Sequence, residues 1–374
     1  MPAPTSLCAA STHAPSRRPF VIAGLAAVLA VTIGVPAPAD AQGGSTQRTR
    51  ASKTSLEAGE ASSRPGYATR VEVQDFIRDM AQRHGFVESE LQTLFSQVRF
   101  NDAVIRLMAP AAPGFRRSWQ AYRARFLDAL RVREGLRFWR DNEAALNRAT
   151  ERFGVPAEII VSIIGVETVY GRVTGDFRVV DALATLAFDY PRRADYFRSE
   201  LEQFLLFTRE NSSDVFAARG SYAGAIGLPQ FMPGSIRRFA VDFDGDGRID
   251  LQTNPVDAIG SVANFLAEHG WQRDEPVRFT MQYDDEQRLA PLVANGIEPR
   301  LTINEMAAFG VASTEPVAVD RPLALIDLPN ADAPTSYYLG ARNFYVITRY
   351  NRSSFYAMAV YELSRVLADT RQTR

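Results

Sequence analysis

Glu167 combines the residue type and the setting of an acid–base catalyst. It follows an apolar run, and Ile160, Ile163 and Ile164 precede it by seven, four and three residues. Because these spacings share one face of a helix, the carboxyl group is expected on an apolar stripe. Loss of solvent raises the pKa of a carboxyl, and a general acid must carry its proton near neutral pH. The sequence therefore offers Glu167 as a general acid. The plainer alternative is an acid that meets solvent or an arginine for structural reasons.

Alternating aspartates form a second group that could carry out a chemical role. The stretch Asp242 to Arg248 matches the first half of a calcium loop, with carboxylates at positions one, three and five, a glycine at six and a backbone carbonyl at seven. The glutamate that usually closes such a loop is absent, because Thr253 stands at position twelve. Either the loop is longer than usual and Asp257 closes it, or the stretch is a metal-free turn. The oxygen spacing favours Ca²⁺.

The element that carries Glu167 is bounded at both ends. Pro156 suits the first turn of a helix, where its missing N–H is not needed, and Gly171 suits the position just after the last turn. These signals predict one helix that includes Tyr170, three residues after Glu167 on the same stripe.

Helical periodicity covers most of the remaining chain. The predicted helical stretches are Val73 to Val98, Trp119 to about Asn147, Val179 to Phe188, Ala194 to about Glu210, Asp257 to His269, and Phe344 to Leu367. Short β-branched and aromatic runs interrupt this pattern between about 274 and 328, including Val277 to Met281 and Leu323 to Leu328. We therefore expect a mainly α (α+β) fold, in which a small β element is inserted in a helical protein.

Polar groups also occur between the helices. Arg192 and Arg193 follow a proline and are either a solvated helix start or, if they face Glu167, a site for carboxylates or acetamido sugars. Ser221 and Gln230 lie in a segment of three glycines and two prolines, which is either an ordinary loop or a tight turn approaching a ligand. Tyr122 belongs to a helix-bundle pattern, although a tyrosine there can line a cleft.

The N-terminal region predicts export. Residues 1–41 combine Arg17, Arg18, an apolar run and an Ala-x-Ala pattern, which indicate a secretory signal, with a loose match to a twin-arginine signal. Residues 42–68 have the composition of a flexible tether. The only cysteine, Cys8, would leave with the signal, so we expect an exported protein without a disulfide, and the apolar run is too short for a comfortable membrane span. The 42 basic and 43 acidic residues give no indication of nucleic-acid binding.

Several separated motifs occur in order along the chain. They are Val166-Glu167-Thr168, Tyr190-Pro191-Arg192-Arg193, Gly220-Ser221-Tyr222-Ala223-Gly224-Ala225, Gln230-Phe231-Met232-Pro233, the aspartate loop and Thr348-Arg349-Tyr350-Asn351. In this order they strongly resemble the lytic murein transglycosylase B family, from about Val71 to the C-terminus. Some members of that family are lipid-anchored, and because this sequence has no suitably placed cysteine, the resemblance implies a soluble periplasmic form without a transmembrane segment.

The resemblance implies a domain plan. It implies an N-terminal helical domain over 69–150, a lysozyme-like catalytic core over 151–273 with a calcium loop at 242–257, a small inserted β domain over 274–334, and a C-terminal segment over 335–374 that completes the catalytic region.

The resemblance also implies site residues. Glu167 resembles the family's catalytic acid/base. The residues that resemble cleft positions holding the glycan or its peptide are Tyr122, Arg192, Arg193, Ser221, Gln230, Tyr350, Asn351 and Tyr356. The residues that resemble the calcium ligands are Asp242, Asp244, Asp246, the carbonyl of Arg248, and Asp257. Asp257 stands one position further along the chain than the family's pattern predicts. Phe265 stands where the family can carry a cleft tyrosine.

The implied reaction cleaves peptidoglycan glycan strands between N-acetylmuramic acid and N-acetylglucosamine without water, leaving a 1,6-anhydromuramoyl end. Most glycosidases that use water need two carboxylates, and the sequence offers one plausible acid. A single acid therefore agrees with a reaction that uses no water. Two alternatives remain open, a lysozyme-type hydrolase with a second acid and a non-catalytic glycan-binding protein.

Overall fold

The computed structural model describes residues 66–110 and 116–373, so the predicted signal and most of the predicted tether lie outside the described residues. The elements of its first part are η1 (Tyr67–Thr69), α2 (Val71–His84), α3 (Glu88–Gln97), α4 (Asp102–Leu107), α5 (Trp119–Arg123), α6 (Ala129–Asp141), α7 (Glu143–Phe153), α8 (Ala157–Thr168), β1 (Phe177–Arg178), α9 (Val179–Asp189), η2 (Pro191–Arg193), α10 (Ala194–Glu210), β2 (Arg219–Gly220), α11 (Pro233–Phe239) and α12 (Pro255–Glu268).

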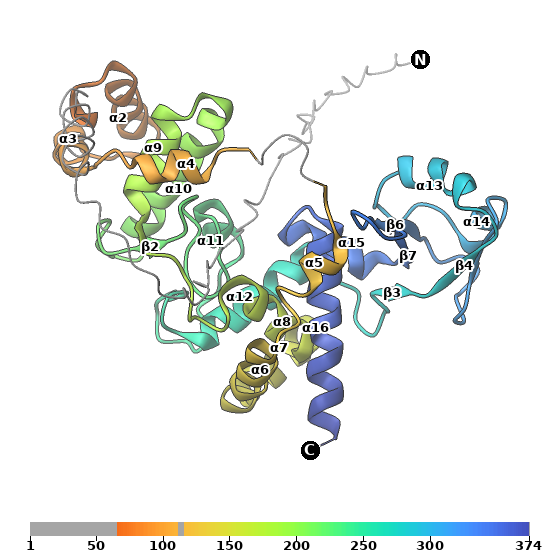
Figure 1. Cartoon of the computed structure of the whole chain (residues 1–374). Helices are drawn as coiled ribbons and strands as arrows, with labels where there is room; N and C mark the ends of the chain where they lie inside the picture. The colour runs from red at the N-terminus through yellow and green to blue at the C-terminus, as the bar shows by residue number, and fades with distance from the viewer. Residues whose placement is uncertain (1–65, 111–115, 374) are drawn as a thin grey trace, which may run out of the picture.

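The second part of the chain contains the longer strands and returns to helices. Its elements are β3 (Arg278–Phe279), β4 (Met281–Tyr283), η3 (Glu286–Leu289), α13 (Ala290–Ala294), α14 (Ile303–Ala307), β5 (Val311–Ser313), β6 (Ala324–Leu328), β7 (Ser336–Gly340), α15 (Arg342–Tyr350) and α16 (Ser354–Gln372). The mainly helical class is confirmed. Figure 1 shows β3, β4, β6 and β7 gathered to one side of the helices, whereas β2 lies among them.

Helix α8 lies at the centre of the helical body. It contacts α6, α7, α12 and α16, and every residue from Ile159 to Val166 is buried. An enclosed helix can be apolar on all sides, which explains why its sequence shows a continuous apolar run rather than a narrow stripe. Glu167 is the penultimate residue of this helix.

The end of α8 differs from the prediction. Val169 and Tyr170 adopt left-handed backbone conformations with φ of 51° and 59°, so the helix ends at Thr168 and Tyr170 does not continue its stripe. The Val169 N–H donates to the Gly165 carbonyl at 3.1 Å and the Tyr170 N–H to the Ile164 carbonyl at 3.4 Å, which caps the last turn. A β-branched residue in this conformation costs roughly 1–3 kcal/mol, a strain that is typical of functional sites.

The helices before α8 belong to two packing groups. Helices α2 and α3 meet α9 through Phe76, Phe95 and Phe188, whose rings pack edge to face at 5.9 to 6.3 Å. Helices α6 and α7 instead contact α8, and α7 also contacts α12. The predicted N-terminal domain over 69–150 thus contributes helices to both groups, which are separate in Figure 1.

The stretch from Trp119 to Asn147 was expected to be one helical stretch, and it forms α5, α6 and the start of α7. Asp128 interrupts it, because its carboxylate accepts the Arg131 N–H at 2.9 Å as the N-cap of α6. The apolar periodicity continues across this cap, and the break is therefore visible only from the capping residue.

The β part lies between α12 and α15 and has its own core. Strand β7 is the centre of an antiparallel sheet of order β3-β7-β6, and β4 pairs with β5. Phe279, Leu325 and Leu339 belong to the buried cluster of this part. Since β7 is its central strand, this part extends to Gly340, beyond the limit of 334 expected from the sequence. After α15, helix α16 returns the chain to α8.

No helix in the described ranges, 66–110 and 116–373, is both long and apolar enough to cross a membrane.

Candidate active site and aspartate loop

The Glu167 carboxyl meets a tyrosine from the far end of the chain. The Tyr356 hydroxyl donates a hydrogen bond to Glu167 Oε1 at 2.7 Å. Tyr356 lies in the first turn of α16, where the Ser353 hydroxyl accepts its backbone N–H at 3.3 Å, and the tyrosine side chain is almost fully buried. A charge-assisted bond of this length holds one carboxylate oxygen in place.

Burial raises the pKa of Glu167 to about 7, and the hydrogen bond from Tyr356 acts in the opposite direction. Glu167 as a residue keeps partial contact with solvent, although its carboxyl is surrounded by protein. No arginine and no second carboxylate within the described ranges adds to this pKa shift. Desolvation therefore dominates, and the group exchanges its proton near neutral pH, as an acid–base catalyst requires.

Two further tyrosines lie near the Glu167 carboxyl. Tyr350 ends α15, its ring stacks on Tyr356 at 6.2 Å, and its hydroxyl donates to the Pro229 carbonyl at 2.5 Å. Tyr122 packs against Phe126 and Phe355 at 4.9 and 5.5 Å. Burial, and next the charge of Glu167, raise the pKa of both Tyr122 and Tyr350, so Tyr122, Tyr350, Tyr356 and Glu167 form one cluster.

The glycine-rich segment is held by its own side chains. The Ser221 hydroxyl oxygen accepts the backbone N–H groups of Ala223 and Ala225 at 3.3 and 3.0 Å. Gln230 has a left-handed backbone with φ of 50°, and its Nε2 donates to the Thr174 and Gly227 carbonyls at 3.0 and 2.9 Å. Gln230 Oε1 is buried and has no hydrogen-bond partner in the described part of the chain. A buried acceptor left unpaired is unusual, and a ligand N–H or O–H would satisfy it.

Thr168 was not assigned a role from the sequence, and it connects the helix of Glu167 to the glycine-rich segment. Its Oγ1 donates to the Leu228 carbonyl at 2.9 Å and accepts the Gly171 N–H at 3.0 Å. A polar residue at the end of an apolar run, directly after the candidate acid, was the available signal. Thr168 positions Glu167 rather than reacting itself.

Three predicted binding residues have contacts that leave their role open. Arg192 is exposed, and the Arg193 guanidinium lies over the Tyr196 ring at 4.3 Å. Asn351 follows α15, is 8% exposed, and its carbonyl accepts the Ser353 N–H at 2.7 Å. Their contact with a substrate stays a prediction.

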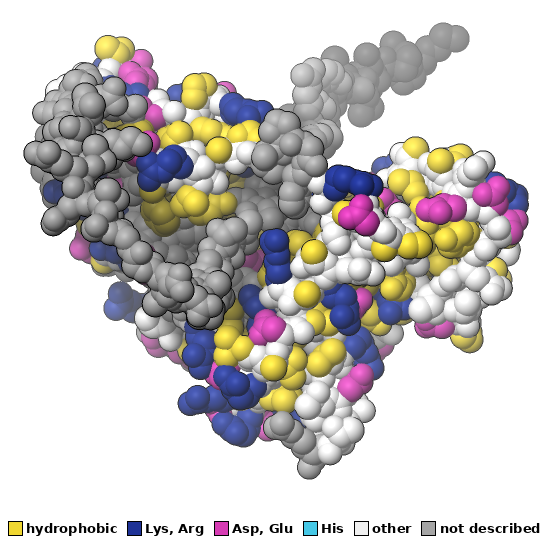
Figure 2. All heavy atoms as spheres, viewed as in Figure 1, with side chains coloured by type: hydrophobic (Ala, Val, Ile, Leu, Met, Phe, Trp, Pro, Cys, Tyr) yellow, Lys and Arg dark blue, Asp and Glu magenta, His cyan; other side chains and the backbone are white. Residues whose placement is uncertain are grey.

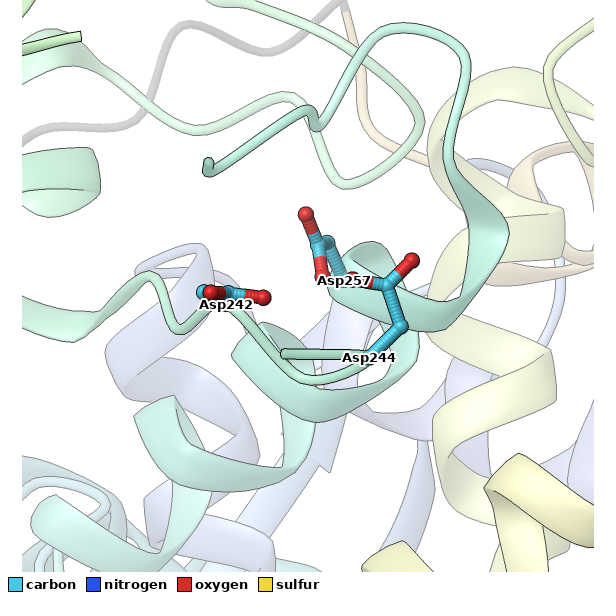
Figure 3. A group of neighbouring side chains, drawn as sticks. All are labelled: Asp242, Asp244 and Asp257. Atoms are coloured by element: carbon cyan, nitrogen blue, oxygen red, sulfur yellow. The ribbon is translucent and has the colours of Figure 1, made fainter. Parts of the chain in front are cut away.

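The aspartate loop brings three carboxylates together. Oxygens of Asp242, Asp244 and Asp257 lie within 4.8 Å of one another, and Figure 3 shows the first two on the loop and the third on α12. Asp257 is completely buried, and its two oxygens accept the N–H groups of Phe243 and Asp250 at 2.8 and 2.9 Å. Three converging carboxylates repel one another unless a cation joins them, so these residues fit a hard divalent ion such as Ca²⁺.

The other two predicted ligands are not part of that group. Asp246 Oδ1 accepts the Arg248 backbone N–H at 2.9 Å. Asn254, which the sequence reasoning did not single out, donates from its side chain to Asp244 Oδ2 at 2.7 Å and caps α12. Participation of Asp246 and of the Arg248 carbonyl stays a prediction.

Most of the chain matches known lytic transglycosylases. The family model described as transglycosylase SLT domain matches residues 68–365. The membrane-bound lytic murein transglycosylase B of Escherichia coli (strain K12) is 44% identical over 310 residues, which cover 81% of this chain and 84% of that protein.

Solved structures resemble the whole described fold. The catenated lytic transglycosylase SltB1 from Pseudomonas aeruginosa is 44% identical, with a TM-score of 0.77 and coverage of 82% of this chain and 99% of that one. The Escherichia coli lytic transglycosylase Slt35 in complex with calcium is also 44% identical, with a TM-score of 0.74 and coverage of 82% and 95%. The acid at the end of α8, the tyrosines around it and these similarities agree, and the chain belongs to the transglycosylase SLT domain family of lytic transglycosylases.

Proposed function

We propose that this lytic transglycosylase cleaves the β-1,4 bond between N-acetylmuramic acid and N-acetylglucosamine in peptidoglycan glycan strands, with Glu167 as both acid and base. The observation that carries the proposal is the pKa of about 7 that burial gives Glu167, with no second carboxylate contributing among the described residues. A hydrolase of the usual type needs a second acid to activate water or to attack the sugar.

The proposed reaction proceeds in two proton transfers. Protonated Glu167 donates to the O4 leaving oxygen of N-acetylglucosamine while the bond from O4 to C1 of the muramic acid breaks. The acetamido group of the substrate assists this departure. The Glu167 carboxylate then takes the proton of the C6 hydroxyl, and O6 forms the new bond to C1. Glu167 ends protonated as it began, and no water enters the product.

Tyr356 has a defined role in these two proton transfers. Its hydroxyl donates to Glu167 Oε1, so it stabilises the carboxylate that forms after the first proton transfer. The other oxygen, Oε2, is the one proposed to exchange the proton with the substrate. Tyr356 is therefore a positioning and stabilising residue for the acid.

The glycan is proposed to lie over the cluster formed by Tyr122, Tyr350 and Tyr356. Gln230 Oε1, the unpaired buried acceptor, suits a sugar hydroxyl or an acetamido N–H, while Ser221 and Asn351 are proposed as further polar contacts. Phe265 packs against Tyr350 at 4.9 Å, so it supports the ring of Tyr350 in place of a polar contact. Arg192 and Arg193 are proposed to bind the carboxylates of the stem peptide.

The aspartate loop is proposed to bind Ca²⁺ as a structural ion. Asp242, Asp244 and Asp257 would hold it, with Asp246 and the Arg248 carbonyl as additional oxygen ligands. The bound ion would neutralise the buried Asp257 carboxylate and join the loop to the start of α12. The Escherichia coli relative solved with calcium supports this choice of metal.

The proposed location is the periplasm, because residues 1–41 have the pattern of a secretory signal.

Glu167→Gln tests the proposed function. We expect the variant to fold, to bind glycan strands and to lose activity by at least about a thousandfold, because no second carboxylate among the described residues contributes at Glu167 to exchange the proton in its place. Binding is measured by co-sedimentation with purified peptidoglycan and activity by release of soluble muropeptides. Near-normal turnover of the variant would reject Glu167 as the catalyst, and an inactive wild-type protein that still binds would favour the non-catalytic alternative.

A further inference from the structure

A cavity lined mainly by arginines lies away from Glu167. Its volume is about 410 Å³, and it is bordered by α6, the first residue of α7 and the end of α16. The lining residues are Arg133, Leu136, Arg137, Arg140, Glu143 and Arg371. Figure 2 shows basic side chains gathered at the lower part of the molecule, where Figure 1 places α6.

The spacing of the sequence explains why these arginines converge. Arg133, Arg137 and Arg140 follow one another at intervals of four and three residues, which places them on one face of α6. Arg371 approaches from the last turn of α16, with its guanidinium 4.8 Å from the centre of the Trp139 ring. Leu136 gives the cavity an apolar part.

Positive charge exceeds negative charge around the cavity. Four arginines and one glutamate line it. These arginines pair with three carboxylates, Arg133 with Glu134, Arg137 and Arg140 with Asp141, and Arg371 with Glu143. The Arg137 and Arg140 side chains are 65% and 72% exposed. Exposed ion pairs contribute little to stability, so an incoming anion can replace them at little cost.

The N-terminal end of α7 lies at the edge of the same cavity, because Glu143 is its first residue. Its N-cap residue, Asn142, makes no side-chain capping bond, and its amide donates instead to the Phe138 carbonyl at 2.8 Å. The first N–H groups of this 11-residue helix thus lack a side-chain cap. Together with the helix dipole, they favour an anion at this edge.

We propose that this cavity binds a phosphate group, as inorganic phosphate or as the headgroup of an anionic phospholipid. Guanidinium groups match phosphate oxygens in paired hydrogen bonds, and four arginines line the cavity against one carboxylate. Arg371 stands fifteen residues after Tyr356 on α16, which is about 22 Å along the helix. The site is therefore separate from the proposed catalytic site and does not depend on the proposed function.

The test compares two double variants with the same change of charge. Arg137→Gln with Arg140→Gln removes two guanidinium groups from the cavity, and Arg288→Gln with Arg300→Gln removes two exposed ones from the β part. Phosphate binding is measured by titration calorimetry, and lipid binding by co-sedimentation with phosphatidylglycerol vesicles and with neutral phosphatidylcholine vesicles. Unfolding curves of all variants confirm that they fold, and Arg371→Gln removes a lining residue from a different helix.

We expect the cavity double variant and Arg371→Gln to weaken binding at least about tenfold, while the β-part variant binds like the wild type. Binding of free phosphate would identify a soluble anion as the ligand, and binding only to phosphatidylglycerol vesicles would identify the lipid headgroup. The proposal is overturned if neither probe binds, or if the two double variants weaken binding equally. Activity on peptidoglycan should be unchanged in all these variants.

Discussion

The Tyr356 hydroxyl donates a hydrogen bond of 2.7 Å to Glu167 Oε1 across 189 positions of sequence. The bond joins the end of α8 to the start of α16, two helices that pack along each other. Because burial raises the pKa of Glu167 and this bond lowers it, the two residues together set how strongly the acid holds its proton. The proton affinity of the candidate catalyst is thus fixed by the packing of two helices.

Tyr356→Phe should reduce kcat about tenfold to a hundredfold, because the carboxylate formed after proton donation loses a charge-assisted hydrogen bond. The pKa of Glu167 should rise further, since the only opposing contribution is removed. The decline of kcat/KM on the alkaline side should therefore move to higher pH. Initial rates between pH 5 and 9 measure both effects.

Tyr350→Phe is the matched control for that change. The Tyr350 hydroxyl donates to the Pro229 carbonyl instead of to Glu167, so its loss should leave the alkaline limb in place. An equal pH shift in both variants would show that the Tyr356 bond does not set the pKa of Glu167.

Replacing Glu167 should make stability less dependent on pH. Its pKa is about 7 in the folded protein against an ordinary value of 4.5, so the folded state binds the proton more tightly. Its contribution to stability is complete below pH 4.5 and is lost as pH rises to about 7. Between pH 5 and pH 8, the unfolding free energy of the wild type should therefore fall by roughly 2–3 kcal/mol more than that of Glu167→Gln.

Urea unfolding of both proteins at pH 5 and pH 8 measures this difference. A difference that does not change with pH would mean that the folded protein does not raise the pKa of Glu167.

The aspartate loop should stabilise the fold only when calcium is bound. Asp257→Asn should remove most of the increase in melting temperature that millimolar Ca²⁺ produces, because Asp257 is the buried member of the three-carboxylate group. Asp246→Asn should lower the increase less, since Asp246 is not in that group. Thermal unfolding with calcium and with EDTA provides the comparison, and a wild-type melting curve indifferent to both would reject the metal site.

Local signals predicted much of the helical scaffold. The predicted stretch Ala194 to Glu210 coincides with α10, and Val179 to Phe188 differs from α9 by one residue. Here apolar periodicity and turn residues act within a few positions, where sequence is most informative. The cap at Asp128 and the left-handed turn at Val169 were not predicted from the sequence, because at each place a single residue overrides the periodicity on either side.

The candidate site was predictable in part. Residue spacing indicated Glu167 as a desolvated acid, but only the family resemblance selected Tyr356, since no local pattern joins residues so distant in sequence. A metal loop closed by Asp257 was one of two open interpretations of the aspartate stretch, the other being a metal-free turn. Asp257 lies beside Asp242 because α12 begins at Pro255 and carries its first turn under the loop. The role of Thr168 depends on the Leu228 carbonyl, which only the fold brings within reach.

The central claim is that the nucleophile comes from the substrate, and digestion of peptidoglycan in ¹⁸O-labelled water tests it most directly. Mass spectrometry of the muropeptides identifies the new ends and any oxygen taken from water at the anomeric carbon. Because no second carboxylate among the described residues contributes at Glu167, we predict mainly 1,6-anhydromuramoyl ends without ¹⁸O. Reducing muramic acid ends carrying ¹⁸O as the main product would contradict this mechanism and indicate a lysozyme-type hydrolase.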